Sequence, residues 1–331
     1  PNLEEINTFR LSTSSHCNMG CNFCTLSKLR EYVCNTPSSI STLDSSHIFS
    51  LIQAVIKSYP TCNQILFVDD DFFISKERGM DFCQRAINMK MSGQLPQNLR
   101  FMCSTHINRI NEENIDFIAQ AGFKVLSIGV ESTSQFVLDS LNKKYRVEKV
   151  LPTTRLIISR EIKPYYTLIL FTPYGRRDDL ISDIAGFKLL GEMGAGLSIE
   201  PYLIPLKGTH LSEIGVEERI RKVDIKGTKK SLYKGFAWLP MDKEVRGIFD
   251  VFEKIYPKYR KLRMDQAAGT HQEKNWQAQV ILEAAVLALF DTEGEIPLEL
   301  GHIVSPDKAT EMMKTLREMP SLDVDVVGTV R

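Results

Sequence analysis

Short apolar runs alternate with helical patterns between residue 6 and about residue 210 of the chain. The runs predict β-strands at residues 8–14, 64–69, 99–105, 124–130, 165–171 and 197–204. The stretches between them have apolar residues at helical spacing and predict helices at about 44–58, 77–91, 111–121, 133–142, 147–160 and 178–193. Strands that alternate with helices form βαβ units, so the pattern predicts an α/β fold with a parallel sheet. Six units are two short of a closed eight-stranded barrel.

Polar residues mark several of the predicted helix ends. Asp44 and Asn111 are expected N-caps, and Gly122 stands where a helix commonly ends. In parallel α/β folds the chemistry gathers at the carboxyl ends of the strands. The polar residues that directly follow each strand are therefore the candidates for a functional site.

The pattern changes beyond residue 212. Residues 217–235 are polar and basic, and helical patterns then follow at about 242–263, 273–290 and 306–318. We therefore expect an α/β domain at residues 1–215 and a mainly helical C-terminal domain at residues 216–331.

Charge and cysteine usage narrow the class of protein. Lys plus Arg (41) equals Asp plus Glu (41), so the formal net charge is zero. Nucleic-acid-binding proteins usually have a basic surplus, so we expect a small molecule or a peptide as the partner and no nucleic acid. Because no apolar run reaches about 18 residues, no membrane span is predicted. Four of the seven cysteines are scattered, which favours core positions in a protein of the reducing cytoplasm over a secreted disulfide framework.

The other three cysteines, Cys17, Cys21 and Cys24, form a C-x3-C-x2-C motif directly after the first predicted strand. Thiolates bind zinc, copper(I) or iron–sulfur clusters. A structural zinc site would need His16 or Cys34 as its fourth ligand. A [4Fe–4S] cluster held by three thiolates would instead leave one iron open for another ligand. The motif alone admits both kinds of site.

The motif resembles that of the radical S-adenosylmethionine (radical SAM) superfamily, in which an aromatic residue precedes the last cysteine. The resemblance continues in chain order through LFVDDDFF (66–73), IGVESTSQFVLDSLNKKY (128–145), LILFTPYG (168–175) and PYLIPLKGTHL (201–211). It covers about residues 7–215 and is greatest to the cobalamin-dependent branch. It implies a partial (β/α)6 barrel for the first domain.

The resemblance assigns roles to the residues of the motif. Cys17, Cys21 and Cys24 would hold a [4Fe–4S] cluster, whose open iron binds the amino and carboxylate groups of S-adenosylmethionine (SAM). Phe23 would lie against the adenine of SAM, with ordinary core packing as the alternative.

Polar residues after the second and fourth strands would bind SAM as well. Asp69, Asp70 and Asp71 occupy the place where the family binds the SAM ammonium. Three adjacent carboxylates repel one another, so a compensating cation is expected, and one of the three is expected to cap the next helix. Glu131 and Ser132 would contact the ribose or the methionine part of SAM.

Two further positions differ from the family pattern. Lys143 stands where relatives often have an arginine on the SAM carboxylate, and a surface lysine is the alternative. His106 stands where several relatives have arginine, and the resemblance gives it no role.

The resemblance implies an enzyme that cleaves SAM reductively to act on an unactivated carbon of a small molecule. A reductase such as flavodoxin or ferredoxin would supply electrons, and cobalamin would be a further cofactor. In the cobalamin-dependent branch a cobalamin domain precedes the barrel, so we expect such a domain N-terminal to this chain. Methyl transfer is the commoner reaction, and oxidative rearrangement or ring contraction, for example of a nucleotide in antibiotic biosynthesis, is the rarer one. A cobalamin-free radical SAM enzyme and a non-catalytic, zinc-stapled α/β binding module are the alternatives.

The basic run in the second domain has two interpretations. It could contact the phosphates of a phosphorylated substrate, or it could form a solvated loop. Its members are Arg219, Arg221, Lys222, Lys226, Lys229, Lys230 and Lys234.

Overall fold

The computed structural model covers residues 1–331. It describes residues 6–15, 17–26, 41–204, 206, 208–213, 220–222, 236–266 and 275–320.

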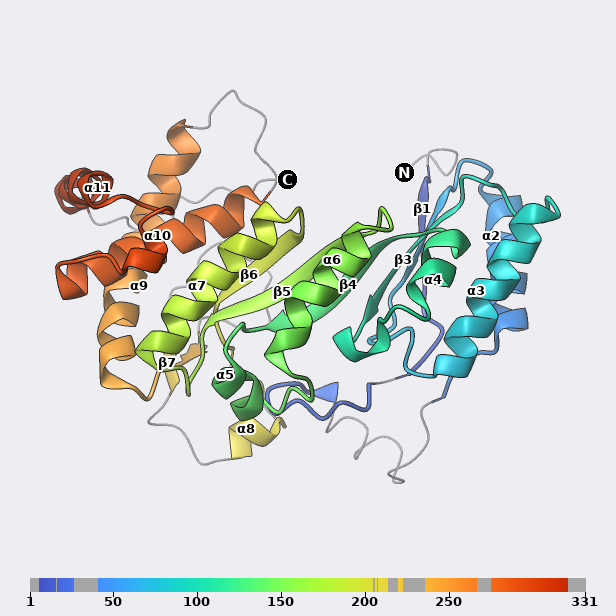
Figure 1. The fold of residues 1–331 in the computed structure, drawn as a ribbon, viewed down its shortest axis with the longest axis horizontal. Coiled ribbons are helices and arrows are strands. Elements are labelled where there is room, and N and C mark those ends of the chain that lie inside the picture. The colour runs from blue at the N-terminus through green and yellow to red at the C-terminus, as the bar shows by residue number, and fades with distance from the viewer. Residues whose placement is uncertain are drawn as a thin grey trace. The chain divides into compact units, whose positions relative to one another are not determined.

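Six strands form one sheet in the order β1-β2-β3-β4-β5-β6, which is also their order along the chain (Figure 1). Neighbouring strands from β1 to β4 pair in parallel. The strand bounds are Thr8–Leu11 (β1), Gln64–Phe67 (β2), Arg100–Thr105 (β3), Phe123–Glu131 (β4), Lys163–Phe171 (β5) and Gly196–Tyr202 (β6). Helices between the strands make this a partial (β/α)6 barrel, which confirms the predicted fold class.

Each predicted helix between the strands is present. The bounds are Ser45–Ser58 (α2), Lys76–Met91 (α3), Ile115–Ala121 (α4), Gln135–Ser140 (α5), Val150–Ile158 (α6) and Arg177–Glu192 (α7), and a short α8 follows at His210–Glu213. Asp44 caps α2, as predicted, because its carboxylate accepts the His47 N–H at 2.9 Å. Gly122 ends α4 with a φ of 109°, a conformation that glycine adopts without strain.

The predicted N-cap at Asn111 is wrong. The helix begins at Ile115, preceded by Asn114, rather than directly after Asn111. The Asn111 side chain instead accepts the N–H groups of Glu113 and Asn114 at 3.1 and 3.2 Å. Asn111 therefore stabilises a turn before the helix, a use of the side chain that competes with helix formation.

The chain folds into two compact units. Unit 1 comprises Pro1–Val130, Asn142–Thr167 and Met193–Gly196, and unit 2 comprises Glu131–Leu141, Leu168–Glu192 and Leu197–Arg331. This division passes through the α/β region, and the domain boundary expected after residue 215 stays a prediction.

An aromatic cluster forms the core of unit 1. Phe67 at the end of β2 lies 4.4 Å from Phe72 between ring centroids, and Phe82 of α3 lies 5.2 Å from Phe101 of β3. Phe101 in turn lies 5.5 Å from Phe123 of β4, and all five rings are fully buried. This packing fixes the end of β2, where the acidic residues of the predicted site begin.

Unit 2 contains the predicted C-terminal helices, α9 (Lys243–Gln266), α10 (Trp276–Glu293) and α11 (Pro306–Glu318). Helix α10 buries a charge among its apolar residues, because Glu283 is 3% exposed. Its carboxylate accepts the Tyr259 hydroxyl at 2.6 Å and Arg263 Nη1 at 2.9 Å, both from α9. These contacts satisfy the buried carboxylate and join the two helices.

A two-stranded antiparallel sheet of β7 (Ile220–Lys222) and β8 (Phe236–Trp238) was not predicted. Arg221 and Lys222 of the basic run lie in β7, and the other members of the run lie outside the described residues. The described helices include none that is both long and apolar enough to cross a lipid bilayer.

Candidate functional site

Cys17, Cys21 and Cys24 lie in the segment after β1, and residues 17–24 are called the cysteine loop below. A backbone hydrogen bond of 3.2 Å from Cys24 N–H to the Cys21 carbonyl closes its second turn. Gly20 has a φ of 73°, where a side chain would be strained. Cys21 is buried, whereas Cys17, Cys24 and Phe23 are half-buried. The loop therefore holds three thiols on a short, sharply bent backbone.

Cys17 lies close enough to the other two thiols for their charges to affect its pKa. Burial raises the pKa of the Cys17 thiol to about 11, although a backbone hydrogen bond from Met19 lowers it. The charges of Asp71, Cys21 and Cys24 raise it further. A bound cation reverses this effect, because metal coordination deprotonates a thiol. The donor set therefore fits a metal centre of the thiolate-binding kind.

Within the described residues, no three His, Cys, Asp or Glu side chains are grouped as a single metal ion requires. The two side chains considered as the fourth ligand of a zinc site, His16 and Cys34, lie outside the described residues. A multi-iron cluster binds its thiolates through separate irons, so the three cysteines need not converge on one point.

The acidic triplet, Asp69–Asp71, follows β2 and divides into buried and exposed members. Asp69 and Asp71 are 2% and 1% exposed, whereas Asp70 is exposed to solvent. None of the three caps α3, because the N-cap of that helix is Ser75, so this part of the prediction is wrong.

Asp69 binds the chain that leads into the cysteine loop. Its Oδ1 accepts the N–H groups of Thr13 at 2.5 Å and Ser14 at 3.0 Å, and its Oδ2 accepts the Thr13 hydroxyl at 2.5 Å. Arg78 Nη2 of α3 lies 3.5 Å from the same carboxylate. Asp69 therefore joins three segments, and Arg78 provides part of the positive charge that adjacent carboxylates require.

Asp71 binds the segment after β3. Its Oδ1 accepts the Thr105 hydroxyl at 2.9 Å and the His106 N–H at 3.4 Å, and its Oδ2 accepts Arg109 Nε at 3.1 Å. Arg109 Nη2 also donates to Asn18 Oδ1 of the cysteine loop at 3.3 Å. The second compensating cation is therefore Arg109, which connects the acidic triplet with the cysteine loop.

Lys143 and its neighbour Asn142 lie in unit 1 with the cysteine loop. Lys143 is 7% exposed, so the alternative of a surface lysine is wrong. Asn142 Nδ2 donates to the Gly20 carbonyl in the cysteine loop at 2.6 Å. This contact places the segment after α5 beside the loop.

Glu131 and Ser132 lie in unit 2, and both are buried. Glu131 ends β4 with a φ of 68°, a strained value for a residue other than glycine. The Ser132 hydroxyl lies 2.8 and 2.9 Å from the two oxygens of Asp183 on α7, and the Thr133 N–H donates to Asp183 Oδ1 at 2.5 Å. Burial raises the pKa of Asp183 to about 7, although the hydrogen bonds from Thr133 and Ser132 lower it in part. Asp183 thus fixes the segment that follows the strained residue.

His106 is buried beside positive charges. Its Nδ1 accepts the Asn108 N–H at 3.2 Å, and its Nε2 has no hydrogen-bond partner in the described part of the chain. Burial lowers the pKa of His106 to about 3, and the charges of Lys143, Arg109 and Lys149 lower it further. The imidazole is therefore neutral at physiological pH.

We expect the ring signals of His106 in NMR spectra to stay constant between pH 5 and 8, because the neutral form persists well below pH 5. Below pH 6.5 the unfolded chain binds a proton that the folded chain does not, so acid destabilises the fold through this group. A His106→Gln variant identifies the signals by their loss. A midpoint near pH 6.5 for those signals would show that the ring is solvated.

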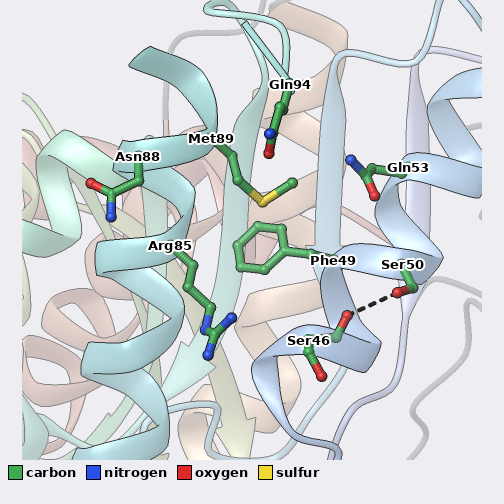
Figure 2. Close-up of a pocket in the computed structure, with 8 residues that line it drawn as sticks. All are labelled: Ser46, Phe49, Ser50, Gln53, Arg85, Asn88, Met89 and Gln94. Atoms are coloured by element: carbon green, nitrogen blue, oxygen red, sulfur yellow. Dashed lines mark hydrogen bonds between the residues drawn. The ribbon is translucent and has the colours of Figure 1, made fainter. Parts of the chain in front are cut away.

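A pocket of about 290 Å³ lies on the helical layer, between α2 and α3 (Figure 2). Phe49 and Met89 form its apolar part, and polar side chains such as Gln53 and Gln94 surround them. No residue of the predicted site lines it. The pocket is therefore not a candidate for the chemistry of the cysteine loop.

Comparison with known proteins shows the family of the chain and supports its fold. Residues 11–186 match the family described as the radical SAM superfamily. The cobalamin-dependent S-adenosylmethionine radical enzyme OxsB with aqua-cobalamin bound superposes with a TM-score of 0.61 at 14% identity, over 93% of this chain and 53% of OxsB. The radical S-adenosylmethionine methyltransferase TsrM from Kitasatospora setae, with cobalamin and a [4Fe–4S] cluster bound, gives 0.57 at 12% identity, over 93% of this chain and 61% of TsrM. No curated protein matches the chain. The chain thus spans between half and two thirds of the length of these two structures.

Sequence reasoning missed the residues that hold the predicted site in place. Arg78 and Arg109 have no motif of their own, and their acidic partners are fixed only by the fold. Asn142 stands within the motif at 128–145, which is the one signal that could have found it. The SAM-binding roles predicted for the acidic triplet, Glu131, Ser132, Lys143 and Phe23 stay predictions.

Proposed function

Because the chain belongs to the radical SAM superfamily, we propose that Cys17, Cys21 and Cys24 bind a [4Fe–4S] cluster and that the protein cleaves SAM reductively. The cleavage would serve a reaction at an unactivated carbon of a small molecule. The observation that carries the proposal is the presence of three cysteines, inside the matched region, on a loop too short for two metal centres. When bound, the cluster supplies the electron that cleaves the sulfonium of SAM.

The chain's own residues would bind and orient the cofactor. The carboxylate of Asp70 is the member of the acidic triplet proposed for the SAM ammonium, because it is the one exposed to solvent and therefore open to a ligand. Lys143, buried in the unit that holds the cysteine loop, would bind the SAM carboxylate. Glu131 and Ser132 would contact the ribose or the methionine part, and Phe23 the adenine. The burial of Lys143, Glu131 and Ser132 would exclude water and strengthen the polar contacts that these three residues make.

We extend the proposal to cobalamin as a second cofactor, bound by a domain N-terminal to this chain. The support is the similarity of fold to OxsB and TsrM, whose structures contain cobalamin. The reaction would be methyl transfer or an oxidative rearrangement of a small molecule, with a phosphorylated compound as one candidate substrate. A cytoplasmic reductase such as flavodoxin or ferredoxin would supply the electrons, in a compartment that keeps the thiols reduced.

The test is anaerobic purification and reconstitution with iron and sulfide. We expect about four irons and four sulfides per chain, a brown colour that dithionite bleaches, and release of 5′-deoxyadenosine and methionine from SAM. Cys17→Ala should lose the iron, whereas Cys62→Ala, a buried cysteine outside the loop, should retain it. A colourless protein with one zinc and no SAM cleavage would establish the binding-module alternative instead.

Cobalamin dependence is tested separately, on the full-length gene product. Cobalt that copurifies with the protein, and a product that forms only when cobalamin is present, are the expected results. Product formation without cobalt would identify a cobalamin-free enzyme. Mass analysis of the product distinguishes the addition of a methyl group from a rearrangement.

A further inference from the structure

Two side chains from distant segments hold the backbone between Cys17 and Cys21. Arg109 Nη2 donates to the Asn18 side chain at 3.3 Å, and Asn142 Nδ2 donates to the Gly20 carbonyl at 2.6 Å. Asn18 and Gly20 are both among the three residues that separate the first two cysteines. The conformation of this short spacer therefore depends on contacts from outside the loop.

The side chain of Arg109 is itself held by a buried carboxylate, that of Asp71. It ends η2 (Ile107–Arg109), and its Nε donates to Asp71 Oδ2 at 3.1 Å. The Asp71 side chain is 1% exposed and that of Arg109 is 28% exposed. The Asp71 carboxylate also accepts hydrogen bonds from the Thr105 hydroxyl and the His106 N–H. Because these bonds fix the carboxylate, the guanidinium paired with it has little freedom to turn. The planar fork of arginine lets one side chain reach two acceptors, which a lysine amine does with less geometric control.

Asn142 contacts the part of the loop that has a left-handed backbone. Gly20 has a φ of 73° and Asn142 a φ of 55°, so both residues have a left-handed backbone conformation. A Cβ on Gly20 would lie 3.8 Å from Asn142 Nδ2 and from Lys144 Nζ, which is ordinary contact. Glycine is therefore required here for its backbone conformation rather than for space, and the amide of Asn142 satisfies the carbonyl that this conformation exposes.

Charge distinguishes the two side chains. Arg109 links the buried carboxylate of Asp71 to Asn18 of the cysteine loop, so a guanidinium charge lies beside the loop. The guanidinium of Arg109 contacts both Asp71 and the loop, whereas the amide of Asn142 is neutral. Removal of either side chain alters the geometry of the loop, but only removal of Arg109 alters its electrostatics.

We propose that Arg109 and Asn142 are positioning residues that impose the conformation of the cysteine loop, and that Arg109 in addition supplies positive charge beside the metal centre. The inference rests on the proposed function, since it concerns how the [4Fe–4S] cluster is held and tuned. Hydrogen bonds and net charge around a cluster set its reduction potential, and residues behind the ligands control how well a metal is retained.

The experiment compares the anaerobically reconstituted protein with four single variants of it. These variants are Arg109→Gln, Arg109→Lys, Asn142→Ala and Asn18→Ala. Iron loss to a chelator and the midpoint potential of the cluster are measured. We expect iron loss to be about 10–100-fold faster in Arg109→Gln and Asn142→Ala. The potential should become more negative in Arg109→Gln, because loss of a nearby cation disfavours the reduced cluster, and should be unchanged in Asn142→Ala. Arg109→Lys keeps the charge, so it should restore the potential but not the retention of iron.

Matched controls come from the exposed face of α3. Arg85 forms an ion pair with Asp81 at 2.9 Å, and Asn88 accepts a hydrogen bond from Gln84 at 3.2 Å. Arg85→Gln and Asn88→Ala should behave as the unsubstituted protein in both measurements. If Arg109→Gln fails to fold, Asn18→Ala removes the same contact and leaves the pair of Arg109 and Asp71 intact.

The outcomes separate the inference from the proposed function. A protein that takes up no iron overturns the proposed function. A protein that binds the cluster, but whose Arg109, Asn142 and Asn18 variants match the α3 controls, overturns the inference alone. A potential that is the same in Arg109→Gln and in Asn142→Ala overturns the electrostatic role of Arg109.

Discussion

Asp69→Ala is expected to lower the free energy of unfolding by about 3–5 kcal/mol, the cost of breaking a buried ion pair by removing one partner. The Asp69 side chain is fully buried and that of Arg78 is 7% exposed, so the guanidinium would lose a buried counter-charge. The N–H groups of Thr13 and Ser14 would also lose their acceptor. Because these residues lead into the cysteine loop, iron retention should fall as well. Chemical denaturation of the reconstituted protein, with iron analysis, provides the measurement.

Asp70→Ala is the matched control for this prediction. Its carboxylate is exposed, so the free energy of unfolding should change by no more than about 0.5 kcal/mol, whereas SAM binding should weaken if Asp70 has the proposed role. An Asp69→Ala protein with unchanged stability and weakened SAM binding would reverse the assignment. Asp69 would then be the cofactor ligand and its contacts with Thr13 and Ser14 would contribute little.

The contribution of Asp183 to the stability of the protein is expected to fall as the pH rises from about 4 to about 7, opposite in sign to the contribution of His106 below pH 6.5. Burial raises the pKa of this carboxyl to about 7, whereas an aspartate in an unfolded chain titrates near pH 4. Between these values the folded state binds a proton that the unfolded state has released, so each pH unit costs up to about 1.4 kcal/mol. Over the whole interval the contribution of Asp183 amounts to about 4 kcal/mol.

Asp183→Asn should abolish this part of the pH dependence, because the amide resembles the protonated acid and can still accept the Thr133 N–H. Unfolding curves at several pH values give the slope, and Asp116→Asn, on the exposed Asp116–Arg160 pair, provides the control with an unaltered slope. Equal slopes in Asp183→Asn and the unsubstituted protein would show that the carboxylate is ionised throughout this range. The hydrogen bonds from Ser132 and Thr133 would then outweigh its burial.

The fold could be predicted from the sequence because its elements carry periodic apolar residues. The range of α11 agrees with the prediction, and β2 to β6 are each displaced by only a few residues at their ends. The first strand ends early, at Leu11 rather than residue 14, for a reason outside its own sequence. The N–H groups of Thr13 and Ser14 bind the Asp69 carboxylate rather than a neighbouring strand, so a side chain 55 or 56 positions away ends the strand.

The residues of the candidate site could be chosen from the sequence, whereas the contacts that those residues make could not. Three cysteines at close spacing predict a metal centre, since few other kinds of site need thiols so near together. The acidic triplet gives no sign that two of its members bind protein donors, because Thr13 and Arg109 approach only through the folded sheet. The short strands β7 and β8 were missed because three residues cannot establish a period of two.

Burial alternates along Asp69–Asp71, so the outer two positions hold the protein together and the middle position faces solvent. Asp69 binds Thr13 and Arg78, and Asp71 binds Arg109. A substitution at either carboxylate would leave these partners without their acceptor unless they were substituted as well. The middle residue is exposed to solvent, unlike the two buried carboxylates on either side of it. Under the proposed role of Asp70, descendants of this chain could acquire a different ligand preference at position 70 while inheriting the buried contacts on both sides of it.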